Sequence, residues 1–356
     1  MDESMQSSQR SDIEVSRLSP EQILRRTLPI NLKPEDRCLF EHEFEQRIPA
    51  TELLVMHNVF ASSDGILFKS ARILPQSFAA ASLLEAWKTR SRLKFLAHNY
   101  LLKSSRTISA DALWIVDDWS GGYYHWLADT LPRLYSIGNR VAEVTLLLPD
   151  RFQRLEFVTS SLKPFGVRNI EIIAANEKVF CPRLIVPMHT APSGHHNEAI
   201  VRGIRALMVE TYGNSQCETP ARIYVSRRKA PKRRIINEEE VLKTVTEFGF
   251  DILDAEKFSF AQQVNALSCA RYLVSNHGAG LTNMMFMAAG GNVLELRHQS
   301  DRRYNCYFNL ASALNLNYFY QTCASDNPGE DPHTADIRVD AQALKETLQL
   351  MIGAAK

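Results

Sequence analysis

The chain has 356 residues, of which 45% are hydrophobic and 23% are charged. This length and composition predict a globular protein of two domains and exclude a disordered chain or a small disulfide scaffold. The 41 basic and 40 acidic residues leave a formal net charge of +1, so no global field steers the chain onto DNA or an anionic membrane, and any anion must be bound by a local cluster of charges.

Residues 1–20 are rich in Ser, Gln and charged groups, and we expect them to form a disordered tail. They lack the basic and apolar regions of a signal peptide, and no apolar run of the chain approaches the ~20 residues that span a bilayer. A cytoplasmic protein is therefore expected. The cysteines show no CxxC pair and no zinc-ligand spacing, which predicts reduced thiols and no metal site; they are Cys38, Cys181, Cys217, Cys269, Cys306 and Cys323.

Residues 21–213 are predicted to form an N-terminal α/β domain whose first part, 52–74, is β-rich and interrupted by turns. After that part, apolar runs predict buried strands that alternate with amphipathic helices, which is typical of βαβ units. The predicted strands are 113–116, 144–148, 170–173 and 184–186, and the predicted helices are 123–137, 152–163 and 198–212. Residues 213–220 are predicted to be the hinge to a second domain.

The predicted helix 123–137 carries a polar face in which His125, Asp129 and Arg133 recur every four residues. Pro132 is expected to kink this helix, because proline cannot donate the helical hydrogen bond. A carboxylate beside an imidazole on a cleft-facing helix is a workable general base for a hydroxyl group. The structural alternative is a surface pair of Asp129 with Arg133, and a capping or core role for His125.

Residues 214–335 are predicted to form a second, Rossmann-like domain, followed by a C-terminal helix within 336–356 that packs back on the first domain. Strands at 222–226, 250–253, 271–275 and 292–296 alternate with helices of about ten residues, which favours a parallel sheet. Asn237 with Glu240, and Ser259 with Gln262, have the spacing of capping boxes at the starts of two of these helices.

A basic segment follows the first strand of this second domain. The strand ends in Ser226, Arg227 and Arg228, and a short loop with Arg233 and Arg234 leads to the next helix. An arginine fork matches phosphate oxygens, so these side chains are candidates for binding a diphosphate. The alternatives are an ordinary solvated loop or a patch for nucleic acid, and the neutral charge balance and lack of interleaved aromatic residues argue against the latter.

A glycine-rich turn, 275–283, lies at the carboxyl end of the third predicted strand of this domain, where ligands bind in open α/β sheets. Gly278 and Gly280 would let the backbone N–H groups approach a phosphate, and the helix that follows adds partial positive charge. His277 could donate to a phosphate oxygen or protonate a leaving group, and Glu295 at the next strand end could bind ribose hydroxyls. The alternative is a tight strand-to-helix connection without a ligand.

Together these motifs resemble glycosyltransferase family 61. The resemblance rests on three segments in order: Gly-Tyr-Tyr-His-Trp-Leu-Ala-Asp-Thr-Leu-Pro-Arg-Leu at 122–134, Tyr-Val-Ser-Arg-Arg with Arg-Arg-Ile-Ile-Asn at 224–237, and Ser-Asn-His-Gly-Ala-Gly-Leu-Thr-Asn at 275–283, followed by Val-Leu-Glu-Leu. It implies a GT-B-like α/β fold of two Rossmann-like domains that face a cleft, with a β-rich N-terminal segment. It also implies a metal-independent enzyme that inverts the anomeric carbon.

The resemblance further implies site residues and a setting for this chain. His125 and Asp129 would face the acceptor, either one serving as the base. Gly122 stands where the family pattern has Asn, and the membrane anchor typical of eukaryotic members is not seen. We therefore expect a bacterial-type enzyme of capsular or other surface polysaccharide biosynthesis. The nucleotide-sugar site would comprise Ser226, Arg227, Arg228, Arg234, Asn237, His277, Gly278, Ala279, Gly280, Leu281, Thr282, Asn283 and Glu295.

The sequence thus predicts transfer of a sugar from a nucleoside diphosphate, most simply UDP, to a hydroxyl of a glycan or lipid-linked glycan. No cofactor and no nucleic-acid partner are expected, and peripheral association with the cytoplasmic membrane face is an option. Two alternatives stay open: an enzyme like the polysaccharide pyruvyltransferases, and a non-catalytic binding protein of glycan assembly.

Overall fold

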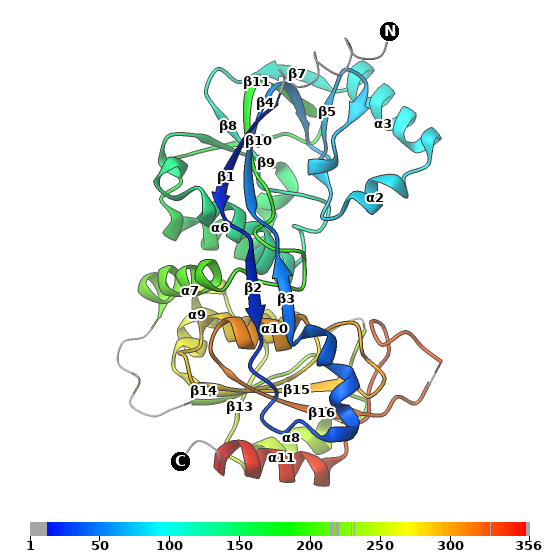
Figure 1. Cartoon of the computed structure of the whole chain (residues 1–356), viewed down its shortest axis with the longest axis vertical. Coiled ribbons are helices and arrows are strands. Elements are labelled where there is room, and N and C mark those ends of the chain that lie inside the picture. Colours follow the sequence, from blue (N-terminus) through cyan, green and yellow to red (C-terminus); the bar gives the residue numbers. More distant parts are fainter. Residues whose placement is uncertain are drawn as a thin grey trace. The chain divides into compact units, whose positions relative to one another are not determined.

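The computed structural model describes residues 13–213, 217, 221–228, 230, 232–327 and 329–353. These residues form two compact units (Figure 1). Unit 1 comprises the described residues up to Gln22 together with Pro49–Ser193, and unit 2 comprises Ile23–Ile48 and the chain from Gly194 onward. The predicted boundary at 213/214 is therefore wrong, and residues 23–48 belong with the second unit. There the Phe40 ring packs 4.9 Å from the Tyr320 ring, a contact that no local sequence pattern reveals.

Unit 1 is built on a mixed sheet, which has nine strands in the described residues, in the order β10-β9-β8-β11-β4-β5-β6 with β1 on β4 and β7 on β11. Strands β7 to β10 run parallel to their neighbours, whereas β4 is antiparallel to β11. The sheet is thus not the all-parallel sheet of a Rossmann-like domain. Its strands are β1 (Ile13–Ser19), β4 (Thr51–Ser62), β5 (Leu67–Lys69), β6 (Arg72–Ile73), β7 (Ser104–Thr107), β8 (Ala112–Leu113), β9 (Thr145–Pro149), β10 (Asn169–Ile173) and β11 (Glu177–Pro187).

Two predictions for the start of unit 1 have different outcomes. The β-rich segment 52–74 is confirmed by β4, β5 and β6. The disordered tail is wrong for Ile13–Ser19, which pairs antiparallel with β4 from Ile13 against Met56 onward. Most side chains of β1 are exposed, so its polar composition suggested disorder while backbone hydrogen bonds hold it in the sheet. Residues 1–12 of the predicted tail lie outside the described residues.

The predicted helix 123–137 is present, but its middle is wider than an α-helix. It begins as α4 (Tyr123–His125), continues as the π-helical turn η4 (Trp126–Thr130) and ends as α5 (Leu131–Ser136). Pro132 lies in the first turn of α5, where its missing N–H is tolerated. The other helices of the unit are η3 (Pro75–Ser77), α2 (Ala81–Glu85), α3 (Thr89–Leu101), η5 (Gly138–Ala142), η6 (Asp150–Arg154), α6 (Glu156–Leu162) and η7 (Lys163–Phe165).

Unit 2 contains the parallel sheet that the sequence predicts for the second half. In the described residues its order is β13-β12-β14-β15-β16, with every neighbouring pair parallel. Numbered within the unit, this is the doubly wound order 2-1-3-4-5, in which the strand order reverses beside the first strand, between β12 and β14. The strands are β12 (Ala221–Val225), β13 (Asp251–Leu253), β14 (Ala270–Asn276), β15 (Asn292–His298) and β16 (Asn317–Cys323).

Helices cover both faces of this parallel sheet: α8 and α11 lie on one face, and α7, α9 and α10 on the other (Figure 1). Leu344 and Leu348 of α11 share a buried core with Val241 of α8, so the C-terminal helix packs within unit 2 and not on unit 1 as predicted. The helices are α7 (Glu198–Tyr212), α8 (Glu238–Glu247), η8 (Ala255–Lys257), α9 (Phe260–Ser268), η9 (Ala279–Phe286), α10 (Cys306–Ala313) and α11 (Ala341–Gly353). Residues 23–48 add η1 (Pro34–Leu39) and η2 (Glu41–Glu43), flanked by the paired strands β2 (Gln22–Arg25) and β3 (Glu45–Ile48).

The two predicted capping boxes have opposite outcomes. Ser259 and Gln262 form one at the start of α9, as predicted. Asn237 does not cap α8 with its side chain; its amide instead donates to the carbonyl of Val339 at 2.8 Å and accepts from the N–H of the same residue at 3.0 Å. Asn237 thus connects two segments of unit 2 that are far apart in sequence.

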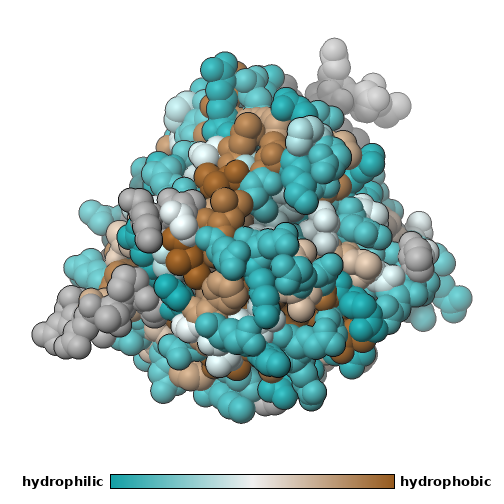
Figure 2. Space-filling model, turned by 90° about the horizontal axis from the view of Figure 1, so that it is seen from below, coloured by the Kyte–Doolittle hydropathy of each residue, from teal (hydrophilic) through white to brown (hydrophobic). Residues whose placement is uncertain are grey.

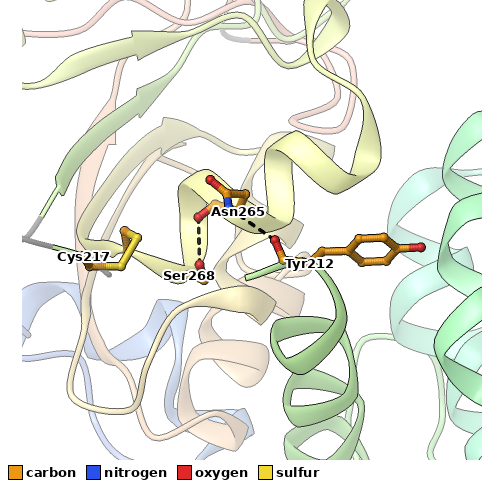
Figure 3. Close-up of a disulfide and its surroundings, with 5 residues drawn as sticks. Tyr212, Cys217, Asn265 and Ser268 are labelled. Carbon is orange, nitrogen blue, oxygen red and sulfur yellow. Dashed lines mark hydrogen bonds between the residues drawn. A yellow bond between two sulfur atoms is a disulfide. The ribbon is translucent and has the colours of Figure 1, made fainter. Parts of the chain in front are cut away.

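A disulfide joins Cys217 to Cys269, across 52 residues of chain and with 5.5 Å between the Cα atoms (Figure 3). The prediction of reduced thiols is wrong for this pair, because wide spacing in the sequence says nothing about distance in space. Nearby, the Asn265 side chain donates to the backbone carbonyl of Tyr212, the last residue of α7, at 3.4 Å. The remaining cysteines, Cys38, Cys181, Cys306 and Cys323, are free thiols.

The surface is that of a globular protein. On the face in Figure 2 most residues are hydrophilic, with one band of hydrophobic side chains between them. Among the described helices, none combines the length and the apolar content needed to cross a membrane.

Candidate functional site

The basic segment and the glycine-rich turn follow neighbouring strands at the point where the strand order reverses. Val225 of β12 lies opposite Ser275 of β14, and the Ser275 hydroxyl donates to the Val225 carbonyl at 2.8 Å. Arg227 lies two residues after the end of the first strand, and His277 directly follows the second. In open α/β sheets ligands bind at the carboxyl ends of strands at this reversal point, so the topology of unit 2 places both motifs where a ligand is expected.

Arg227 lies directly over Gly278. A β-carbon added to Gly278 would be 2.5 Å from Cζ of Arg227, closer than real Cβ contacts, and the φ of +155° at Gly278 also disfavours a side chain. A glycine at this position therefore lets the guanidinium group rest on the backbone of the turn. The structure brings together the arginine and the glycine-rich turn that the sequence assigned to one diphosphate.

A second arginine, Arg233, joins this cluster. The Nε atoms of Arg227 and Arg233 are both buried and have no hydrogen-bond partner. Burial lowers the pKa of Arg227, and the charge of Arg233 lowers it further. Two adjacent guanidinium groups with buried, unused donors are unfavourable on their own and would be stabilised by a bound anion.

The neighbouring arginines lie differently. Arg234 is paired with Asp336, with Nε and Nη2 at 3.1 and 2.8 Å from one carboxylate oxygen, and Arg228 is exposed. The sequence assigned Arg234 to the diphosphate, but its fork already holds a carboxylate in the structure. Arg233 faces the cluster instead, with a left-handed φ of +57° that the sequence pattern did not indicate.

His277 is held by a buried carboxylate. Its Nδ1 lies 2.5 Å from Oε1 of Glu295, whose other oxygen accepts a hydrogen bond from the Tyr318 hydroxyl at 2.5 Å. Burial alone would raise the pKa of Glu295, but the charge and hydrogen bond of His277, the charge of Arg297 and the hydrogen bond of Tyr318 together outweigh it, and the pKa is lowered. Both oxygens of Glu295 thus form hydrogen bonds inside the protein, and the carboxylate orients the imidazole. The sequence had instead predicted that Glu295 binds ribose hydroxyls.

The remaining predicted ligands of unit 2 divide between the turn and the core. Leu281, Thr282 and Asn283 are buried, and the Asn283 amide donates to Gln263 of α9 at 2.9 Å. The Ser226 hydroxyl donates to Glu238 at 2.7 Å. These side chains support the loops, whereas the backbone from His277 to Gly280 lies at the strand end; Gly280 approaches Val225 so closely that a β-carbon would be 2.8 Å from its side chain.

Tyr304 and His333 extend the cluster and were not found from the sequence. Their rings lie 4.8 Å apart, and Tyr304 also neighbours the His277 ring at 6.3 Å. The Nδ1 atom of His333 is buried without a partner, and burial, followed by the charges of Lys232 and Arg233, lowers the pKa of this histidine. His333 lies in a segment without periodicity or motif, so only the fold reveals its place.

In unit 1, His125 and Asp129 form a hydrogen-bonded pair. Nδ1 of His125 lies 2.7 Å from Oδ2 of Asp129, and the Ser193 hydroxyl donates to the same oxygen at 2.7 Å. The Asp129 side chain is 4% exposed, whereas that of His125 is 32% exposed and packs 4.9 Å from the Trp119 ring. The buried carboxylate thus orients an accessible imidazole and leaves its Nε2 available to a reactant.

Arg133 does not join this pair, although the sequence placed all three side chains on one face. The π-helical turn changes the face that later residues occupy. Arg133 is buried; its Nε donates to the Pro187 carbonyl at 2.8 Å, and its Nη1 lies 3.6 Å from Asp117. Asp117 also accepts a hydrogen bond from Nε2 of His189 at 2.9 Å, so these three side chains form a separate buried network.

The described residues contain no group of three or more His, Cys, Asp or Glu side chains placed to hold a metal ion. The positive charge at the strand ends of unit 2 comes from the guanidinium groups of Arg227 and Arg233.

Residues 123–294 match the family model "Glycosyltransferase 61". The EGF domain-specific O-linked N-acetylglucosamine transferase of Bos taurus is 31% identical over 102 residues, which cover 27% of this chain and 19% of that protein. The corresponding protein of Mus musculus is 30% identical with the same coverage. Beta-1,2-xylosyltransferease XAX1 of Oryza sativa subsp. japonica is 38% identical over 81 residues, 22% of this chain and 13% of that protein. The chain spans about a fifth or less of the length of these relatives, and the matches support a glycosyltransferase.

Proposed function

We propose that the chain is an inverting, metal-independent glycosyltransferase that moves a sugar from a nucleoside diphosphate to a hydroxyl of a glycan or lipid-linked glycan. The observation that carries this proposal is the position of Arg227 over Gly278, with Arg233 beside it, at the reversal point of a doubly wound sheet. The family match over 123–294 supports the same class of reaction.

The arginine cluster is suited to stabilise the diphosphate leaving group of such a reaction. As the bond between the anomeric carbon and the diphosphate oxygen breaks, the electron pair stays on the diphosphate. Arg227 and Arg233 would stabilise that charge through the donors that are unused in the structure, in the role that a divalent cation has in metal-dependent enzymes. His277, oriented by Glu295, would add a further donor.

The His125 and Asp129 pair is suited to activate the acceptor hydroxyl that attacks the donor sugar. We assign the base to His125, because its imidazole is accessible whereas the Asp129 carboxylate is buried and already accepts two hydrogen bonds. Nε2 of His125 would take the proton of the acceptor hydroxyl as its oxygen attacks the anomeric carbon, and Asp129 would stabilise the imidazolium. Displacement by one attacking oxygen, without a covalent intermediate, inverts the anomeric carbon. We propose that unit 1 serves the acceptor and unit 2 the donor.

The setting of the enzyme stays a prediction. UDP as the donor nucleotide, surface polysaccharide as the product and peripheral membrane association are expectations from the sequence alone. The Cys217–Cys269 disulfide weighs against the expected cytoplasmic location, because disulfides persist mainly in oxidising compartments.

Thermal shift and calorimetry of the full chain with UDP-, GDP-, CMP- and dTDP-sugars, with and without EDTA, test the proposal. We expect one nucleotide sugar to bind, EDTA to have no effect, and Arg227→Ala to abolish binding at unchanged melting temperature. Arg228→Ala is the matched variant, because this exposed neighbour should matter little. Binding of phosphoenolpyruvate alone would favour the pyruvyltransferase alternative, and equal binding by the wild type and Arg227→Ala would remove the diphosphate role.

A further inference from the structure

Unit 1 contains a cavity of about 300 Å³ that none of the motifs predicted. Its walls are mostly apolar, and its lining includes Pro75, Phe78, Met188, Pro192, Gln76 and His189. A volume of this size is at the lower end of the range for small-molecule sites, enough for one ring and its substituents.

The cavity adjoins the His125 and Asp129 pair through the backbone in two places. Pro192 lines the cavity, and the next residue, Ser193, donates to Asp129. In addition, the N–H of the lining residue Ala79 donates to Asp118 at 2.9 Å, and Asp118 immediately precedes Trp119, which packs on His125. The cavity is therefore linked to the group to which we assign the acceptor proton through residues adjacent in the chain to Pro192 and through the Ala79 to Asp118 hydrogen bond.

Two lining side chains offer hydrogen-bond acceptors that the protein does not use. Oε1 of Gln76 is buried and has no partner. Nε2 of His189 lies 2.9 Å from the Asp117 carboxylate, to which it donates; in a neutral imidazole bonded in this way Nδ1 keeps a lone pair, and no described residue donates to it. A ligand that fits the cavity should therefore carry hydrogen-bond donors for Oε1 of Gln76 and for Nδ1 of His189.

This combination of an apolar wall with two unused acceptors matches a sugar ring. A pyranose presents a face of C–H groups that packs on apolar side chains, and hydroxyls at its edge that donate hydrogen bonds. A hydrocarbon chain would fill the same volume but leave both acceptors without a donor and shielded from water, which is unfavourable. The chemistry of the cavity thus discriminates between the sugar and the lipid part of an acceptor.

We propose that this cavity is the acceptor subsite and that it binds a pyranose ring, with the C–H face against Phe78 and Met188 and two hydroxyls donating to Oε1 of Gln76 and Nδ1 of His189. This inference rests on the proposed transferase function, and it adds that the group recognised next to the base is carbohydrate.

Methionine-methyl NMR tests the inference directly, because Met188 lines the cavity. The full chain is labelled with [¹³C-methyl]methionine, and the Met188 signal is assigned with Met188→Leu. Methyl glucopyranoside, galactopyranoside, xylopyranoside and N-acetylglucosaminide are then titrated, with n-hexanol as the hydrocarbon probe. We expect at least one glycoside to shift the Met188 signal saturably and hexanol to leave it in place.

Gln76→Leu keeps the size of the side chain and removes the acceptor, so it should weaken glycoside binding about tenfold. Gln153→Leu is the matched control, because Gln153 is exposed in the same unit, and it should bind as the wild type does. A shift with hexanol alone, a shift with no probe, or equal affinities of the two variants would each overturn the inference.

The donor assay on the same sample separates this inference from the proposed function. Binding of a nucleotide sugar without any glycoside effect would remove the acceptor subsite and leave the transferase proposal intact. Glycoside binding without nucleotide binding would instead indicate a sugar-binding protein and remove the transferase.

Discussion

The guanidinium group of Arg227 occupies the space that a side chain on Gly278 would need. Two segments that are 51 residues apart in sequence (278 − 227), one basic and one rich in glycine, thereby form one surface at the ends of neighbouring strands. Each segment by itself has an ordinary structural explanation, and their contact is what favours a shared anionic ligand.

Gly278→Ala should displace Arg227 and weaken nucleotide-sugar binding about tenfold or more, because the added methyl group would overlap the guanidinium. It should also cost about 1–2 kcal/mol of stability from the positive φ. Gly290→Ala is the matched control, since Gly290 has a φ of +79° and no neighbouring atom lies within 4 Å of the place that a methyl group would take there. Calorimetric titration should show weaker binding only for Gly278→Ala; equal losses would mean that backbone strain alone is responsible.

Arg233→Ala and Arg234→Ala should differ sharply although the residues are adjacent. Arg233 has a buried, unused Nε beside Arg227, and its loss should weaken donor binding by about 10- to 100-fold, the value of one charge-assisted hydrogen bond. Arg234 forms an ion pair with Asp336, which is partly exposed, so its loss should cost at most ~1 kcal/mol of stability and leave binding unchanged. The dissociation constants of the donor for the two variants measure this difference. Weaker binding by Arg234→Ala than by Arg233→Ala would restore the sequence-based assignment of Arg234 to the diphosphate.

His125→Gln should lower kcat by about 10²- to 10⁴-fold with little change in donor KM, as expected for loss of a general base. Asp129→Asn should lower kcat as well, because Asp129 positions the imidazole through Nδ1. Ser193→Ala removes a hydrogen bond to the same carboxylate and serves as the mild control. Steady-state kinetics with the donor found by the binding screen will show the pattern; full activity of His125→Gln would reassign the base.

Acid should destabilise unit 1 through Asp117. Burial alone would raise the pKa of Asp117, but the hydrogen bond from His189 and the charge of Arg133 outweigh it and lower the pKa from 3.8 to about 2. The folded state therefore binds this proton more weakly than the unfolded state, so the stabilisation is present above pH ~4 and is lost as the pH falls toward 2. It amounts to about 2 kcal/mol.

Urea unfolding between pH 2 and 5 measures this loss, and Asp117→Asn should remove that part of the pH dependence. Asp118→Asn is a useful comparison. Burial raises the pKa of Asp118, so its contribution to the pH dependence of stability has the opposite sign to that of Asp117. Parallel pH profiles of the wild type and Asp117→Asn would contradict the network.

Reduction of the disulfide should lower the melting temperature. Closing a loop of 52 residues restricts the unfolded chain, and in the chain-entropy model this is worth about 4 kcal/mol. Cys217→Ser should reproduce the effect of dithiothreitol, and Cys38→Ser, which alters a free thiol, should not. Thermal melts with and without reductant give the comparison; an unchanged melting temperature would mean that the bond contributes nothing to folding.

The sequence predicts elements with strong local signals well. The helix 198–212 is found with the predicted bounds as α7, and the capping box of Ser259 marks the start of α9. The parallel sheet of unit 2 also follows from strands and helices that alternate at short intervals. In each case the residues that determine the element are its own neighbours in the chain.

The errors concern features that depend on distant contacts. Residues 23–48 belong to unit 2 because Phe40 packs on its aromatic rings, and β1 is held by backbone pairing with β4. Arg233 replaces Arg234 in the cluster because Asp336, about a hundred residues later, engages the latter. Glu295 has the expected position at a strand end, but its partner is His277 and not a ligand.

The chain passes from one unit to the other after Gln22, returns after Ile48 and crosses again after Ser193. A single cut can therefore never release either half intact. A fragment that starts at Gly194 would lack Phe40 and leave the rings of Phe308 and Tyr320 facing water, so it should aggregate even though it contains the whole parallel sheet. Any exchange of one unit between proteins with this chain path, in the laboratory or in evolution, must move two separate stretches of sequence together.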